Sequence, residues 1–208
     1  MTTKPLAFLP NHPFWTFSCQ TYEQAKVALL ALQNRHNLNV NVLLFCCWIA
    51  ASNQGTLSKQ EIKKLLAVIH TWHERIVVPL RELRARLKES TLVYLTENLI
   101  EEALDIEITA EHIEQLFMLD VTLKKAQRKS KNLTFRATQT CQNIELYRQI
   151  VYVYFDEKDC VYLSEILAIL YPEIGINKAF NICHSIFLAK KKPQAPVKKQ
   201  MELELLEE

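Results

Sequence analysis

The sequence contains very little glycine. Gly55 and Gly175 are the only two glycines among 208 residues, whereas average usage of about 7% would supply roughly fifteen. Loops that hold nucleotide phosphates need several glycines, because the backbone must approach the phosphate closely. Two glycines complete neither a GxGxxG nor a GxxxxGK[ST] motif, so nucleotide binding through such loops is excluded. The scarcity also argues against a fold rich in tight hairpins.

Long apolar runs and paired-cysteine motifs are absent too. The longest uninterrupted apolar run covers ten residues, Val42 to Ala51, about half the length of a membrane-spanning helix. The six cysteines follow no CxxC spacing, and the adjacent Cys46 and Cys47 cannot easily form an unstrained disulfide. No secretory segment opens the chain. We therefore expect free thiols, a cytoplasmic location and no membrane span.

Motifs for catalysis and metal binding do not occur either. The sequence has no HExxH, no Glu-x-x-His pair and no DDxxD. The nearest metal-like feature is His70 with His73 and Glu74, and the sequence offers no further ligand to complete a zinc site. We predict no metal and no cofactor, and the sequence identifies no catalytic residue.

What the sequence does contain is helical periodicity. Hydrophobic residues make up 49% of the chain and charged residues 23%, which is ordinary for a globular protein. Capping signals and apolar stripes predict an all-α fold, a single bundle of about six to eight helices within residues 1–190. Thr21 with Gln24 forms a capping box that predicts the start of a first helix, which ends near His36. Residues 191–208 are expected to be a charged, disordered tail.

Two further helices are sharply marked. Asn39 is suited to cap a helix over residues 40–52 that is hydrophobic almost all round and therefore central in the bundle. Ser58 and Glu61 form a capping box that opens a helix over 59–76.

The second half of the chain is less clearly marked. We expect helices over 91–104 and 109–128, separated near Asp105 to Ile108. Residues 128–138 are predicted to form a loop, because they are basic and polar. Residues 140–155 mix helical and strand signals, and we interpret them as a helix because a lone strand would have no partner.

Residues 14–90 resemble a family of uncharacterised proteobacterial proteins that is catalogued as a domain of unknown function. Four segments carry the resemblance: Phe14-Trp15, Ala31-Leu32-Gln33, the run from Asn39 to Trp48, and the run from Trp72 to Arg81. The resemblance implies a small cytoplasmic all-helical domain. It carries no reaction with it, because none is established for the family.

Charge is unevenly distributed although the formal net charge is only +2. Residues 91–121 hold eight acids and no Lys or Arg. The following basic residues are Lys124, Lys125, Arg128, Lys129, Lys131 and Arg136. One interpretation is two solvated helix faces that attract each other within the fold, and the other is a surface that binds a partner.

The best candidate for a binding surface lies around Pro79. Cationic side chains recur there at helical spacing beside a leucine stripe formed by Leu80, Leu83 and Leu87. The candidate binding residues are Trp72, Arg75, Arg81, Arg84 and Lys88. A purely structural alternative places the leucines in the core with the arginines at its border. We predict a non-enzymatic binding or adaptor protein that docks an acidic protein or a phosphate group here.

Two other functions stay open at this stage. Basic segments 75–88 and 124–136 would together bind nucleic acid if they lay on one face. A small-molecule enzyme would need an apolar pocket between helices with convergent polar groups.

Overall fold

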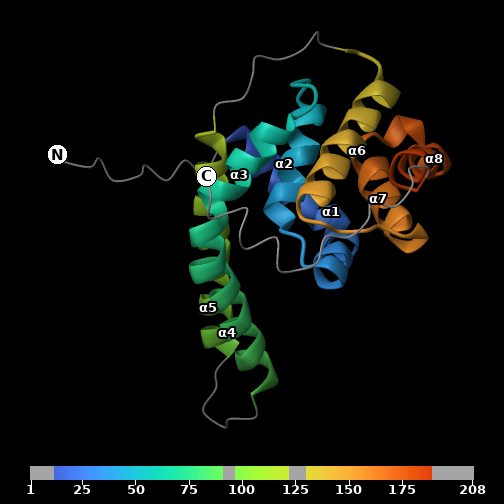
Figure 1. Cartoon of the computed structure of the whole chain (residues 1–208). Coiled ribbons are helices and arrows are strands. Elements are labelled where there is room, and N and C mark those ends of the chain that lie inside the picture. Colours follow the sequence, from blue (N-terminus) through green and yellow to red (C-terminus); the bar gives the residue numbers. More distant parts are fainter. Residues whose placement is uncertain (1–11, 91–96, 122–129, 189–208) are drawn as a thin grey trace.

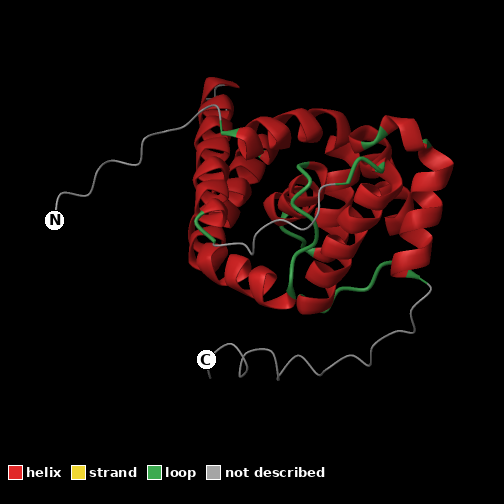
Figure 2. Ribbon diagram, turned by 90° about the horizontal axis from the view of Figure 1, so that it is seen from above, coloured by secondary structure: helices red, strands yellow, loops and turns green. Residues whose placement is uncertain are grey.

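The computed structural model describes residues 12–90, 97–121 and 130–188, and every regular element in these ranges is helical (Figures 1 and 2). The elements are α1 (Pro13–His36), α2 (Val40–Ala51), α3 (Lys59–Trp72), the π-helical turn η1 (His73–Val77), α4 (Val78–Glu89), α5 (Glu97–Leu119), α6 (Leu133–Ile150), α7 (Glu157–Leu170), the 3-10 turn η2 (Pro172–Ile174) and α8 (Ile176–Phe187). Because α3, η1 and α4 follow one another without a break, they form one long helical rod. The prediction of an all-α bundle of six to eight helices is confirmed.

Helix α2 lies at the centre of the fold. All its residues from Val40 to Ala50 are buried except Trp48, which is half-buried. The helix packs against α1 on one side and α6 on the other. A helix that is apolar all round has no face to offer water, so the fold surrounds it. Asn39 caps it, since its side-chain oxygen accepts hydrogen bonds from the Asn41 and Val42 backbone amides, as predicted.

The expected start of the first helix at Thr21 is wrong. Helix α1 begins at Pro13, and the His12 ring accepts a hydrogen bond from the Phe14 backbone amide at 3.1 Å. Proline suits the first turn of a helix because its missing N–H would have no partner there. Thr21 is buried inside the helix. Its end at His36 and the capping box of Ser58 and Glu61 in α3 agree with the prediction.

The two helices expected on either side of Asp105 are one helix. Helix α5 runs unbroken from Glu97 to Leu119, and the remaining residues of the two expected ranges, 91–96 and 122–128, lie outside the described part of the chain. The β-branched residues near Asp105 lower helix propensity by only a few tenths of a kcal/mol each. A buried stripe at helical spacing outweighs that cost; its members are Ala103, Glu107, Ala110 and Glu114.

Boundaries around α6 also differ from the prediction. The helix begins at Leu133, inside the expected loop, and ends at Ile150. Residues 151–155 leave the helix through Tyr152, whose φ of 56° is left-handed. The helical interpretation of 140–155 therefore holds for its first two-thirds. Residues 191–208, the predicted tail, lie outside the described residues.

Pro79 stands in the first turn of α4, directly after the π turn. Proline has no N–H to offer the carbonyl of Arg75, four residues earlier, and its ring crowds that carbonyl. The π turn is wider than an α-helical turn and accommodates the proline. Within it, the Val78 amide donates to the His73 carbonyl, five residues earlier. The π turn thus leads directly into α4, with Pro79 in the first turn of that helix.

Helices α4 and α5 lie side by side and project from the rest of the molecule (Figure 1). We call α4 together with residues 97–111 of α5 the arm. Helix α4 contains no buried residue. Leu83, expected beside Leu80 and Leu87 in an inward stripe, is 50% exposed, whereas the other two are half-buried. The arm is therefore a hairpin with two helices and little core of its own.

One buried amide connects α6 to the loop between α2 and α3. Asn143 Oδ1 accepts the Leu57 backbone amide at 2.8 Å, and Asn143 Nδ2 donates to the Cys46 carbonyl at 3.1 Å. The side chain is 1% exposed. It satisfies backbone groups that water does not reach.

We expect Asn143→Ala to lower the free energy of unfolding by about 2 kcal/mol, because the Leu57 amide and the Cys46 carbonyl lose their partner. Urea unfolding followed by circular dichroism measures this. Gln142→Ala, an exposed position on the same helix, is the matched control. Equal unfolding midpoints for the two variants would contradict the assignment.

Candidate functional site

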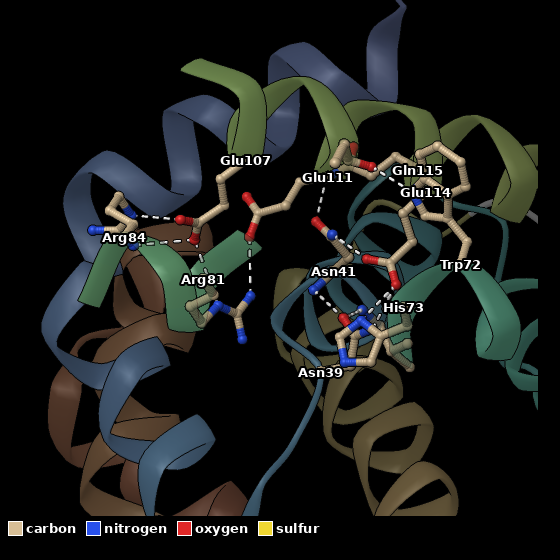
Figure 3. A network of polar contacts seen from close by, with 12 residues as sticks. Asn39, Asn41, Trp72, His73, Arg81, Arg84, Glu107, Glu111, Glu114 and Gln115 are labelled. Carbon is tan, nitrogen blue, oxygen red and sulfur yellow. Dashed lines mark hydrogen bonds and ion pairs between the residues drawn. The ribbon is translucent and has the colours of Figure 1, made fainter. Parts of the chain in front are cut away.

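Glu114 of α5 is a fully buried carboxylate with three side-chain donors (Figure 3). Asn39 Nδ2 lies 3.0 Å from Oε1, His73 Nδ1 lies 2.8 Å from the same oxygen, and Asn41 Nδ2 lies 2.5 Å from Oε2. A buried carboxylate is stable only when its oxygens accept several hydrogen bonds. We therefore place the proton of His73 on Nδ1, from where it donates to Glu114.

The hydrogen bonds extend from these residues to Gln115 of α5 and to helix α6. Gln115 Nε2 donates to Asn41 Oδ1 at 2.7 Å. The Asn39 backbone amide donates to the Tyr147 hydroxyl of α6 at 3.0 Å. Burial raises the pKa of Tyr147, so its hydroxyl stays neutral. This network, which we call the Glu114 network, joins the start of α2, the π turn, α5 and α6.

A second set of contacts continues along the arm (Figure 3). Arg84 donates to both oxygens of Glu107, with Nη2 3.0 Å from Oε1, and its Nε forms the other contact. Arg81 Nη2 lies 3.0 Å from Glu111 Oε1. The hydrogen bond from Arg84 to Glu107 raises the pKa of the Arg84 guanidinium. Arg81 and Arg84 thus hold α4 against α5.

The three inward acids of α5 follow helical spacing. Glu107, Glu111 and Glu114 are four and three residues apart, so they lie on one side of the helix. The rod that packs against this side supplies one basic side chain for each acid, namely Arg84, Arg81 and His73. Helix α5 runs antiparallel to the rod of α3, η1 and α4. The basic partners therefore occur in the opposite order along the chain to the acids they pair with.

The predicted binding residues divide into two groups. Trp72, Arg81 and Arg84 face α5; the Trp72 indole Nε1 donates to the Ala110 carbonyl at 2.9 Å. Arg75 and Lys88 are exposed. Of the acids in residues 91–121, Glu107 and Glu111 pair with arginines of α4. Most of the basic run after residue 121 lies outside the described residues, so its expected attraction to these acids stays a prediction.

Sequence reasoning missed the amides of the Glu114 network. Asn41 carried a usable signal, because a polar side chain inside an otherwise apolar helix needs a buried partner. Glu114 carried none, since it is one of eight acids in a run. Asn39 was identified only as a helix cap. Its side-chain oxygen caps α2, and its side-chain nitrogen donates to Glu114.

The cysteines are free thiols, and five of the six are buried. Burial raises the pKa of Cys47 and of Cys160 to about 12. Cys141 and Cys183 have their sulfur atoms 3.8 Å apart. Within the described residues, no three His, Cys, Asp or Glu side chains are grouped to hold a metal ion. A raised pKa keeps the Cys47 and Cys160 thiols protonated, which fits a role in packing.

An open groove of about 400 Å³ lies between α7 and α8. Its lining residues are Val161, Ser164, Glu165, Ile176, Asn177, Phe180 and Asn181. Glu165 is its one titratable side chain. The groove is remote in sequence from the Glu114 network and from the arm.

We expect Glu114→Ala to lower the free energy of unfolding by about 3–5 kcal/mol, because the buried Asn39 and Asn41 amides and the half-buried His73 ring lose their acceptor. Chemical denaturation measures the change. Glu102→Gln, at an exposed position of the same helix, should change it by less than about 0.5 kcal/mol. A loss for Glu114→Ala as small as that of the control would show that the donors find other partners.

Glu111 gives a pH dependence of known sign. Burial raises the pKa of its carboxyl, although Arg81 opposes the shift. A pKa above the unfolded value, about 4.3, means that the folded state favours the protonated form. The stability that Glu111 contributes is therefore present at low pH and is lost as pH rises through the folded pKa. Relative to the native chain, Glu111→Gln should gain stability between about pH 4 and pH 7. Unfolding of both proteins at several pH values tests this. The prediction would be contradicted if the stability of Glu111→Gln relative to the native chain increased as the pH was lowered.

No helix within the described ranges has the length and apolarity that crossing a membrane requires. Neither the curated proteins nor the solved structures contain a significant match to the chain. The family model described as "Protein of unknown function (DUF2390)" matches residues 13–118. That range covers α1 to α4 and nearly all of α5, and it holds every member of the Glu114 network except Tyr147. The chain therefore belongs to this family of unknown function.

Proposed function

We propose that this chain is a cytoplasmic binding protein whose arm docks another protein. One observation carries the proposal: large apolar side chains are concentrated in the exposed surface of the arm. Among the described residues, twelve large apolar side chains are exposed, and five of them lie on the arm: Leu83, Leu99, Leu104, Ile106 and Ile108. Single exposed apolar residues are common, whereas a concentration of them indicates an interaction site.

The positions of these residues support contact with a partner on more than one side. Leu99 and Ile106 are seven residues apart and lie on one side of α5, and Leu104 and Ile108 are four apart and lie on another. Ile106 is 55% exposed. The inward side between them is occupied by Ala103, Glu107 and Ala110. Apolar side chains thus border α5 on both sides of its contact with α4.

The polar contacts of the arm also suit a docking role. Arg81 and Arg84 fix α4 to α5, and the Glu114 network fixes α5 to the central helix α2. A surface that is held in place before binding loses less conformational freedom when the partner docks. The free thiols support a reducing cytoplasm as the location.

Nucleic-acid binding has weaker support. Arg75 and Lys88 are exposed, but Arg81 and Arg84 are occupied by carboxylates, and Arg136 donates to the Ala51 carbonyl at the end of α2. Lys124, Lys125, Arg128 and Lys129 lie outside the described residues. For an enzyme, the groove between α7 and α8 offers Glu165 as its one titratable lining residue. We retain both as alternatives that the following experiment distinguishes.

A photo-crosslinking amino acid placed at Ile106 or Ile108 tests the proposal in living cells. We expect protein adducts at both positions that persist after nuclease treatment, because a docked partner contacts both apolar sides. Val27, which is 77% exposed on α1, is the control position and should give none. Adducts of equal yield at Val27, or adducts only to nucleic acid, would contradict the proposal.

A further inference from the structure

The outer side of α5 carries acids that no cation of the described residues compensates. Glu101, Glu102 and Asp105 are exposed, and none of them forms an ion pair with a described residue. Helix α5 contains no Lys or Arg. The two arginines that reach it from α4 pair with the inward acids Glu107 and Glu111. Charge is therefore balanced inside the arm and negative outside it.

Acidic and apolar side chains form a single stripe on this outer side. Glu101, Leu104, Asp105 and Ile108 stand at i, i+3, i+4 and i+7, so they are neighbours on one helix face. All four are exposed, Leu104 at 37% and Ile108 at 40%. We call this set the outer stripe. Its spacing is that of a helix that packs against another helix.

The chemistry of the outer stripe selects among partners. Negative charge repels phosphate, which disfavours nucleic acid and anionic lipid. A second copy of the chain, docked stripe to stripe, would place acids opposite acids. The described residues contain no strand whose edge could accept an extended peptide. A helix remains, with an apolar stripe to cover Leu104 and Ile108 and flanking cations to meet Glu101 and Asp105.

We propose that the outer stripe of α5 binds a cationic amphipathic helix of a partner protein, through apolar contacts at Leu104 and Ile108 and ion pairs at Glu101 and Asp105. This inference depends on the proposed function and names the chemistry of the partner. It also changes the sign expected from the sequence, because Arg81 and Arg84, two of the cationic side chains that predicted an acidic partner, are already neutralised by α5.

A fluorescent 18-residue amphipathic helix built from Leu and Lys is the probe, titrated with the full chain and followed by anisotropy. A peptide of the same composition in scrambled order controls for charge alone. We expect the amphipathic peptide to bind at least about tenfold more tightly than the scrambled one. Binding should weaken as salt rises, because the ion pairs are exposed. Equal binding of the two peptides would overturn the proposal.

Two double variants locate the contact. Glu101→Lys with Asp105→Lys should weaken binding at least about tenfold, and so should Leu104→Ala with Ile108→Ala. The matched control is Glu23→Lys with Val27→Ala, which changes an exposed acid and an exposed apolar side chain on α1. Circular dichroism melting confirms that each variant folds. Unchanged binding by either outer-stripe variant, or equal loss in the control, would overturn the assignment.

The outcomes separate this inference from the proposed function. In one outcome, Ile108 gives adducts with a partner that has no cationic helix, and the probe peptide does not bind. This outcome would leave the docking role intact and remove the proposed chemistry of the partner. Sedimentation of the chain as a dimer that the outer-stripe variants dissociate would identify a second copy as the occupant and would likewise overturn it. No adducts at either arm position would remove both.

Discussion

The hydrogen bonds to the Glu114 carboxylate are the interaction on which the arrangement of the helices depends. A charged group at this depth is tolerated only because Asn39, Asn41 and His73 surround it with donors. These donors come from the start of the central helix and from the π turn. One carboxylate therefore fixes where α2 begins, how the long rod of α3 and α4 is rotated, and where α5 crosses both. Apolar packing alone would allow several such arrangements, since aliphatic side chains fit one another in many orientations.

The arm applies the same principle with less burial. Its inward side is built from small and charged residues, such as Ala103 and Glu107, so it gains little from the hydrophobic effect. Bidentate contacts from Arg84 to Glu107 supply directional attachment instead. As a consequence the apolar side chains of α5 stay on its borders, where they are exposed. The ion pairs that attach the arm thus also leave these apolar side chains exposed.

Local signals in the sequence predicted the helical class, the capping of α2 by Asn39 and the start of α3 at Ser58. Each depends on residues within one turn of the feature. The sequence could not predict that Arg81 and Arg84 would meet Glu107 and Glu111, because partners separated by more than twenty residues have no local signature. It also misplaced the start of α1, where Thr21 with Gln24 imitates a capping box inside a longer helix. The cations near Pro79 were visible in the sequence, whereas the partners of Arg81 and Arg84 came only from the tertiary fold.

The position of α2 between α1 and α6 has a consequence for how the family relates to the fold. The matched region ends at Met118, near the end of α5, yet α6 covers one side of the most apolar helix. Helix α6 also supplies Tyr147 to the residue that caps α2, and Asn143 to the Cys46 carbonyl and to the loop after α2. In this chain, residues 13–118 alone would leave the side of α2 that packs on α6 without its cover. The most apolar helix of the matched region therefore depends on a helix that lies outside that region.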